Sequence, residues 1–143
     1  MRYSAQSRKA LTESFEGCRL KAYRDSKGVW TIGYGHTGGI VEEGMTCTQV
    51  QADIWLALDI AWAESVVNRE VKLQLTQNEF DALVDFVFNC GAGNFHSSTL
   101  LRLVNAGRHA EAALEFEKWD HCSGQVVAGL LRRRQAEEAL FLK

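Results

Sequence analysis

The spacing of apolar residues along the chain changes from a helical period to an alternating one and back again. In Ser4–Phe15 the apolar residues Ala10, Leu11 and Phe15 lie on one face of a helix, and Gly17 follows as a typical helix stop. This segment is therefore predicted to be a short helix. After it, the glycine-rich stretch up to about residue 44 shows no helical period.

Residues 20–36 have the composition of a tight hairpin. Asp25-Ser26-Lys27-Gly28 is a turn sequence, flanked by Tyr23 and by the strand-forming run Val29–Ile32. The chain has no proline, so its turns depend on its 12 glycines. We expect a small, twisted antiparallel sheet that ends by about Gly44.

The helical period returns at Thr48. The apolar positions of this segment form one wide face, made by Val50, Ile54, Leu58 and Ala61 and broadened by Ala52, Trp55 and Trp62. A helix apolar over so wide an arc is predicted to run through the middle of the protein. Twenty residues rising about 1.5 Å each would span about 30 Å, enough to join two lobes.

The rest of the chain is predicted to be helical. Thr76–Glu79 is a capping box that opens a helix ending near Cys90, and Ser97 or Ser98 starts the next, which runs to Gly107. Two more helices are expected, over Arg108–Trp119 and Gly129–Leu142. One helix, a small sheet and then a helical bundle indicate an α+β fold. We predict one domain over 1–143, with a β lobe at about 18–46 and a helical lobe made of 1–17 and 47–143.

Length and composition fit a single soluble globular domain. The chain has 143 residues, of which 46% are hydrophobic and 24% charged. Its net charge of −2 is uneven, because residues 1–24 carry six basic and two acidic side chains, whereas residues 25–98 carry three basic and ten acidic. Strong non-specific nucleic-acid binding needs a concentrated basic stripe, so no nucleic-acid partner is expected.

No targeting or metal-binding signal is visible. There is no apolar run of about 18 residues, and Met1–Gly17 lacks the apolar region of a signal peptide. We therefore expect a chain that is made in the cytoplasm and needs another factor to leave it, although removal of an earlier N-terminal segment stays open. No Cys-x-x-Cys is present, so no metal or cofactor is expected. The cysteines are expected to be mostly buried free thiols, with a disulfide left open: Cys18, Cys47, Cys90 and Cys122.

The candidate chemistry lies in the N-terminal quarter. Glu16 ends the first helix beside Phe15, where burial would raise the pKa of its carboxyl group, whereas Asp25 sits in a polar turn and should stay ionised. Two carboxylates with different pKa values can act as an acid and a base on a glycosidic bond. Strand alternation turns the Thr31 hydroxyl away from its apolar neighbours, toward a cleft, although it is also an ordinary strand former. His36 is expected to hold its loop by hydrogen bonds.

The residues around these groups resemble a known family. Two blocks carry the likeness: Phe15-Glu16-Gly17-x-Arg19-Leu20-Lys21-Ala22-Tyr23-x-Asp25 and Gly28-x-x-Thr31-Ile32-Gly33-x-Gly35-His36-Thr37. Further matches follow in Leu75–Leu83, Phe88–Gly91, Ser98–Leu101, Trp119 and Gly129–Glu137. The chain is similar over nearly its whole length to the phage-type lysozymes of glycoside hydrolase family 24, the endolysins, and to their lambdoid and P22-like branch.

This resemblance implies a fold, a substrate and residue roles. The fold is lysozyme-like, with a cleft between a small sheet lobe and a helical lobe joined by a long helix. The substrate is the β-1,4 bond between N-acetylmuramic acid and N-acetylglucosamine in bacterial peptidoglycan, which an endolysin hydrolyses to lyse the host cell. Glu16 would be the general acid, and Asp25 and Thr31 would stabilise charge and position water, an arrangement that indicates inversion.

The resemblance also implies secondary contacts and some departures. Thr37 and Phe88 would contact substrate, and the Arg132–Arg134 cluster would meet stem-peptide carboxylates or face solvent. The enzyme would act as a monomer on the wall after release from the cytoplasm. Gln74 and Ala128 replace prolines that are common in this branch, which affects loop rigidity rather than chemistry.

Two other readings of the same residues are open. Cys18 or Cys47 with His36 would suit a Cys–His peptidase or amidase, which would release amines instead of reducing sugar ends. A non-catalytic wall-binding module is the third possibility. The presence of Glu16, Asp25 and Thr31 together argues against it, because binding alone does not need that set.

Overall fold

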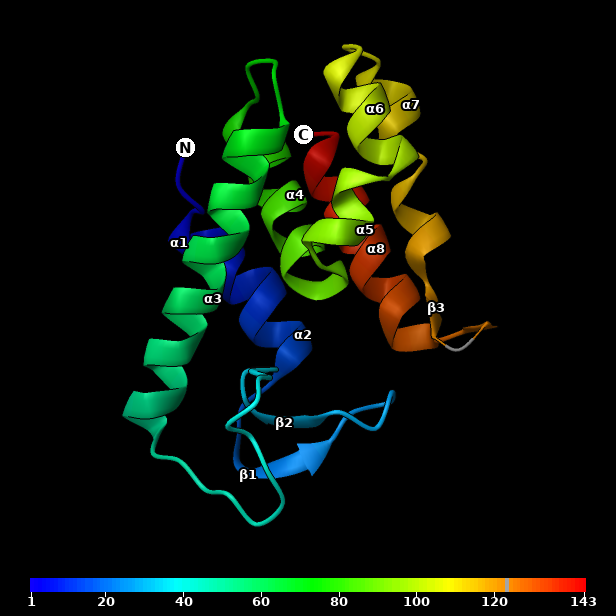
Figure 1. The fold of residues 1–143 in the computed structure, drawn as a ribbon. Coiled ribbons are helices and arrows are strands. Elements are labelled where there is room, and N and C mark those ends of the chain that lie inside the picture. The colour runs from blue at the N-terminus through cyan, green and yellow to red at the C-terminus, as the bar shows by residue number, and fades with distance from the viewer. Residues whose placement is uncertain (123) are drawn as a thin grey trace.

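A small β lobe and a larger helical lobe make up the computed structural model, which describes residues 1–122 and 124–143 (Figure 1). The helical elements are α1 (Ala5–Ser7), η1 (Arg8–Glu13), α2 (Ser14–Glu16), α3 (Gln49–Glu70), α4 (Gln77–Cys90), α5 (Ala92–His96), α6 (Thr99–Asn105), α7 (His109–Ala113), η2 (Phe116–Trp119) and α8 (Ala128–Phe141). The strands are β1 (Arg19–Arg24), β2 (Trp30–Gly33), β3 (His121–Cys122) and β4 (Gln125–Val126).

The N-terminal helical run follows the prediction and ends where the site begins. Ser4 caps it, its hydroxyl accepting a hydrogen bond from the Ser7 amide at 3.2 Å. The run continues through a π-helical segment, η1, to Glu16. Gly17 has φ +64°, a left-handed conformation that glycine adopts without strain, and the chain leaves the helix there. Glu16 is therefore fixed on the last helical residue.

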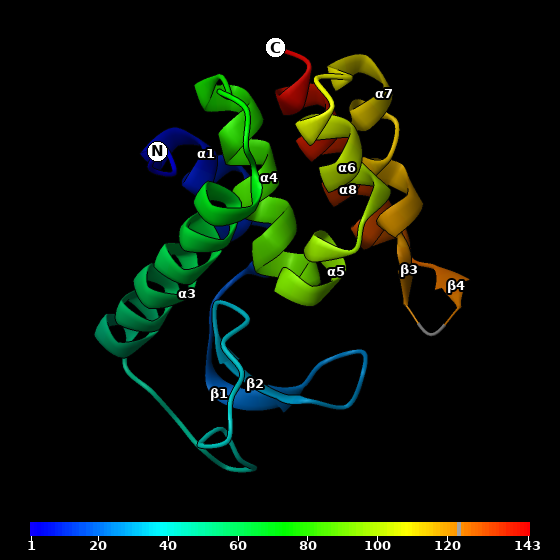
Figure 2. The same ribbon diagram turned by 45° about the horizontal axis from the view of Figure 1, so that its top comes forward.

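The predicted antiparallel sheet is present. Strands β1 and β2 pair with Tyr23 opposite Thr31 and Arg24 opposite Trp30, and a bulge separates these pairs from Arg19 opposite Gly33. The loop before α3 adds one isolated antiparallel bridge, between Lys21 and Thr46. Figures 1 and 2 show the sheet as a separate lobe at the lower end of α3.

Helix α3 joins the two lobes as predicted, but its buried face is not the predicted one. Its capping box uses Thr48 and Gln51, and its core positions are Ala52, Leu56, Ile60, Ala63, Val66 and Val67. The predicted face is instead exposed at Val50, Ile54, Leu58 and Trp62. Because α3 is apolar on two sides, the helical period alone did not select the side that packs against α4 and β2.

Helix α4 lies at the centre of the helical lobe (Figure 2). Its capping box uses Thr76 and Glu79, and Phe80 to Val87 are all buried. The Phe86 ring meets Phe116 and Trp119 edge-on, with ring centres 5.8 Å and 5.6 Å apart. The core therefore holds α4, η2 and α8 together and fixes the wall of the helical lobe that faces the sheet.

Three local predictions differ from the structure. Arg108–Trp119 is not one helix but two short ones, α7 and η2, because the chain turns at the exposed Leu114 and then buries Phe116. Helix α5 and the β3–β4 hairpin were not predicted, since each is too short to show a period.

Within the described residues, no helix is both long and apolar enough to cross a membrane.

Candidate active site

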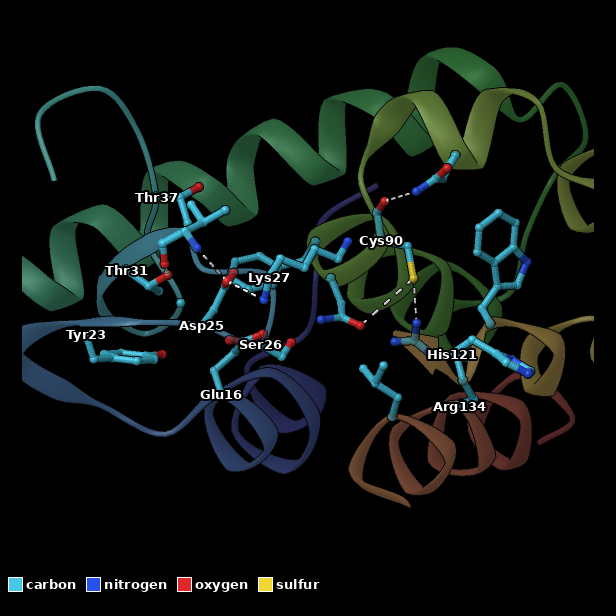
Figure 3. A pocket seen from close by; sticks show the side chains of 17 residues that line it. Glu16, Tyr23, Asp25, Ser26, Lys27, Thr31, Thr37, Cys90, His121 and Arg134 are labelled. Atoms are coloured by element: carbon cyan, nitrogen blue, oxygen red, sulfur yellow. Dashed lines mark hydrogen bonds between the residues drawn. The ribbon is translucent and has the colours of Figure 1, made fainter. Parts of the chain in front are cut away.

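A cleft of about 500 Å³ lies between the hairpin lobe and the helical lobe. The predicted residues Glu16, Asp25, Thr31, Thr37 and Phe88 all line it. Figure 3 shows the first three on the side formed by α2 and the hairpin, whereas Cys90, His121 and Arg134 come from the helical side. Residues far apart in the sequence thus face one hollow.

The Glu16 carboxyl group is held by an arginine, not only by apolar neighbours as predicted. Arg133 Nη1 donates a hydrogen bond to Glu16 Oε1 at 2.6 Å, and the side chains of Glu16 and Arg133 are only 16% and 4% exposed. The Arg133 guanidinium also lies over the Phe15 ring, with its central carbon 5.8 Å from the ring centre. One carboxyl oxygen, Oε1, is therefore fixed in place.

Gly35 packs directly against the second oxygen, Glu16 Oε2. A Cβ atom on residue 35 would overlap Glu16 Oε2 and lie 2.9 Å from Glu16 Cδ. Gly35 also has φ +71°, within the tight turn in which Ile32 and His36 exchange two backbone hydrogen bonds of 2.9 Å. This glycine therefore sets how closely the sheet lobe approaches Glu16.

If Glu16 is the general acid expected from the sequence, Gly35→Ala should lower the rate of peptidoglycan hydrolysis by about 100-fold, because the added methyl group displaces the Glu16 carboxyl group and small misplacements of a catalytic group cost about that much. Gly39→Ala is the matched control, since no atom lies within 4 Å of its Cβ position. The measurement is the release of reducing ends from peptidoglycan by both variants. Equal rates would contradict the proposed contact.

The Asp25 carboxylate organises the hairpin turn with one of its oxygens. Asp25 Oδ1 accepts hydrogen bonds from the Lys27 and Val29 amides, both at 2.9 Å. The Gly28 amide donates to the Asp25 carbonyl at 2.9 Å, and Gly28 takes the left-handed φ of +78°. The turn chemistry seen in the sequence therefore fixes the orientation of a carboxylate that lines the cleft.

Thr31 lies on β2 with its side chain buried at the base of the cleft. Its hydroxyl donates to the Val29 carbonyl at 2.9 Å, so its oxygen lone pairs remain to accept a hydrogen bond from a cleft water. Tyr23 faces it across the sheet and lines the same cleft. Burial raises the pKa of the Tyr23 hydroxyl, and the nearby Glu16 charge adds to this effect.

His36 lies at the edge of the site, in contact with α3. Its Nδ1 is 2.8 Å from Asp59 Oδ2, and its ring stacks on Trp55 with ring centres 4.8 Å apart. Neither Cys18 nor Cys47 is among the described residues that line the cleft. This geometry favours a loop-holding His36 over a Cys–His pair.

Arg133 belongs to a buried network that the sequence did not reveal. Its Nε and Nη2 atoms both donate to Asp85 at 2.9 Å, and the Thr12 hydroxyl also donates to Asp85, at 2.6 Å. The Tyr3 hydroxyl lies 3.0 Å from that of Thr12. Burial alone would raise the pKa of Asp85, but the Arg133 charge and these hydrogen bonds lower it to about 2.

One of the two alternatives for Arg132–Arg134, a face in solvent, is wrong for two of the three residues, whereas contact with stem-peptide carboxylates stays a prediction. Arg132 is exposed, but Arg133 and Arg134 are buried. Arg134 donates to Glu137 Oε1 at 2.7 Å and to the Cys90 thiol, and its guanidinium lies over the Phe86 ring at 5.2 Å. Glu137 lies four residues after Arg133 and three after Arg134, and this helical spacing is the only signal of the two ion pairs in the sequence.

The thiols differ in their surroundings. Cys18, Cys47 and Cys90 are free and partly buried, and the Cys122 side chain lies outside the described part of the structure. Burial raises the pKa of Cys90 to about 11, which leaves this cleft residue as a neutral thiol.

Among the described residues, no group of three or more His, Cys, Asp or Glu side chains is placed to hold a metal ion.

Comparison with known proteins connects this geometry to a family. A family model described as "Phage lysozyme" matches residues 13–137. The endolysin of Salmonella phage P22 is 43% identical over 131 residues, which cover 89% of this chain and 89% of that protein. The endolysin of Bacillus phage PZA is 46% identical over 133 residues, 92% of this chain, but this chain spans only 52% of its length.

A solved structure agrees with the fold. The muramidase domain of SpmX from Asticaccaulis excentricus superimposes with a TM-score of 0.88 and is 43% identical to this chain. The match covers 99% of this chain and 98% of the muramidase domain. The whole described fold, not only the hairpin, is therefore shared with that domain.

Proposed function

Since the chain belongs to the phage lysozyme family, we propose that it is an endolysin, a muramidase that hydrolyses the β-1,4 bond between N-acetylmuramic acid and N-acetylglucosamine in bacterial peptidoglycan. The observation that carries the proposal is that Glu16, Asp25 and Thr31 line one cleft. All three come from the same chain, so one copy carries the complete set, and we propose that the active unit is a monomer. The enzyme is made in the host cytoplasm and acts on the wall after release.

Glu16 is the general acid in this proposal. Arg133 holds Oε1, so the proton is carried on Oε2, the oxygen beside Gly35. A glycan strand in the cleft excludes water from this partly buried group, and Oε2–H is then donated to the leaving glycosidic oxygen. The fixed geometry orients the acid before the bond breaks.

Asp25 and Thr31 position the attacking water. The Thr31 hydroxyl already donates a hydrogen bond to the Val29 carbonyl, so its oxygen is placed to accept a hydrogen bond from the attacking water. Asp25 uses Oδ1 for the turn amides, which leaves Oδ2 to accept the other hydrogen and to stabilise positive charge on the sugar. A water held by these two oxygens attacks the anomeric carbon as the glycosidic bond breaks, and it passes one proton to Asp25 Oδ2 while Glu16 gives its own to the leaving oxygen. A direct attack by water inverts the configuration of the anomeric carbon.

The test of the function is the identity of the new chain ends. Purified protein incubated with peptidoglycan should release fragments with new reducing sugar ends, identified by mass spectrometry, and no new free amines. Free amines would instead support a peptidase or amidase. Intact glycan and peptide after incubation would support a binding module.

Two substitutions at Asp25 separate its charge from its role in the turn. Asp25→Asn keeps an Oδ1 acceptor for the Lys27 and Val29 amides, so we expect an unfolding temperature within about 2 °C of the wild type but a rate at least 100-fold lower. Asp25→Ala should show the same loss of hydrolytic rate and also lose about 1 kcal/mol of stability. Thermal melts and reducing-end assays check both variants. Wild-type turnover by Asp25→Asn would exclude a catalytic role for the negative charge of Asp25.

A further inference from the structure

A second hollow of about 270 Å³ continues the cleft toward α3. It shares Gly35, Thr37, Phe88, Asn89 and Cys90 with the main cleft, so the two spaces are connected. Its other lining residues are Asp59, Trp62 and Gly91. The extension therefore leads away from Glu16 and Asp25, along the wall where α3 meets the end of α4.

Trp62 is the end of a stripe on α3 that faces the sheet lobe and the cleft. Trp55, Asp59 and Trp62 are spaced four and three residues apart, so they lie on one side of the helix. The first two contact His36, by stacking and by a 2.8 Å hydrogen bond. Trp62 is one turn further, beyond the sheet lobe, and is 48% exposed.

The hollow combines an aromatic side chain with planar polar groups. Asp59 and Asn89 line the hollow together with Trp62, and Thr37 adds a hydroxyl. Asp59 Oδ2 is engaged by His36, which holds the carboxylate in one orientation. Among the described residues, no hydrogen bond is made to its other oxygen, Oδ1. Vicinal sugar hydroxyls bind well to carboxylate and amide groups, and the C–H face of a pyranose, which carries slight positive charge, packs on the negative face of an indole.

Resting on the function proposed above, we infer that Trp62 is the stacking platform of an additional saccharide subsite in which Asp59 and Asn89 bind sugar hydroxyls. The ligand is a sugar unit of the same glycan strand, some units away from the bond that is cut. The subsite adds affinity for long strands and leaves the chemistry at Glu16 untouched. Trp62 is thus a specificity-determining residue and not a catalytic one.

Leu58 provides a matched control on the same helix. It lies one turn before Trp62 and is 62% exposed, but it does not line either hollow. Both side chains are therefore large, apolar and exposed, and truncating either one should leave the fold intact. Only Trp62 is placed to touch a glycan in the cleft.

The experiment measures binding without turnover. In a Glu16→Gln background, isothermal titration uses peptide-free strands of alternating N-acetylglucosamine and N-acetylmuramic acid, with two to eight sugars. We expect Trp62→Ala to weaken binding of the eight-sugar strand about tenfold and that of the disaccharide less than twofold. Trp62→Phe should recover part of the loss, and Leu58→Ala should bind like its parent. With Glu16 present, the Trp62→Ala defect should appear in KM and not in kcat.

The outcomes distinguish this inference from the proposed function. Equal affinity of the Trp62→Ala variant and its parent for every strand length would overturn the subsite while leaving the muramidase proposal in place. An equal loss in Leu58→Ala would also overturn it, because the effect would then belong to the helix surface in general. No binding of any strand by the Glu16→Gln parent would overturn both proposals.

Discussion

We expect Glu16→Gln to lower peptidoglycan hydrolysis by at least about 1000-fold, since general acid catalysis contributes about 100- to 10,000-fold. The amide retains an oxygen that can accept the hydrogen bond from Arg133, so the buried guanidinium keeps this neighbour. What it lacks is an acidic proton for the glycosidic oxygen. Release of reducing ends measures the loss, and a thermal melt should move by no more than a few degrees.

Glu13→Gln is the matched control for this substitution. Glu13 is on the same helical run and pairs with Arg8 at 3.2 Å, but it does not line the cleft. Full activity is expected from Glu13→Gln, since surface ion pairs contribute little. A Glu16→Gln enzyme with wild-type turnover would remove Glu16 from the mechanism.

Asp85→Ala is expected to cause the largest loss of stability, about 3–5 kcal/mol, or roughly 10–17 °C in the unfolding temperature. Asp85 accepts two hydrogen bonds from Arg133 and one from Thr12, all without contact with water. Removing it leaves the buried Nε and Nη2 donors of Arg133 without their acceptor, while Glu16 and, at 3.9 Å, Glu137 stay near the guanidinium. Arg133 is then less firmly held in its position beside Glu16. Thermal and urea unfolding measure the loss, and activity should fall as well.

The exposed Asp53 on α3 provides the comparison. Asp53 accepts a 2.9 Å hydrogen bond from Gln49 at the surface, so Asp53→Ala should change stability by no more than about 0.5 kcal/mol. Similar melts for the Asp85→Ala and Asp53→Ala variants would show that the buried network does not stabilise the fold.

Acid should lower the free energy of unfolding of the wild type through Asp85. The pKa of Asp85 is about 2 in the folded protein and 3.8 ordinarily, so folding favours the ionised form. This contributes about 2 kcal/mol above pH 4, and the contribution is lost as pH falls from about 4 to about 2. Unfolding free energies measured across this range should fall more steeply for the wild type than for Asp85→Ala.

Local sequence signals determined the elements that carry the proposed catalytic groups. Gly17, the Asp25–Gly28 turn and the two capping boxes act within a few residues of their own position, so they predict element ends without knowledge of the fold. The spacing of Glu16, Asp25 and Thr31 lies inside one such local unit. For this reason the candidate site, the hairpin and the long joining helix could be read from the sequence.

Tertiary packing decided what local signals leave undetermined. The apolar residues of α3 fit two faces, and contact with α4 and β2 selected Leu56 and Ile60 over Ile54 and Leu58. Arg133 is 117 residues from Glu16 in sequence, yet it is the partner that fixes the carboxyl group. From sequence alone, a charged residue such as Arg133 is predicted to be exposed. Burial of its charge is favourable only when the fold places partners of opposite charge beside it, and those partners are distant in the sequence.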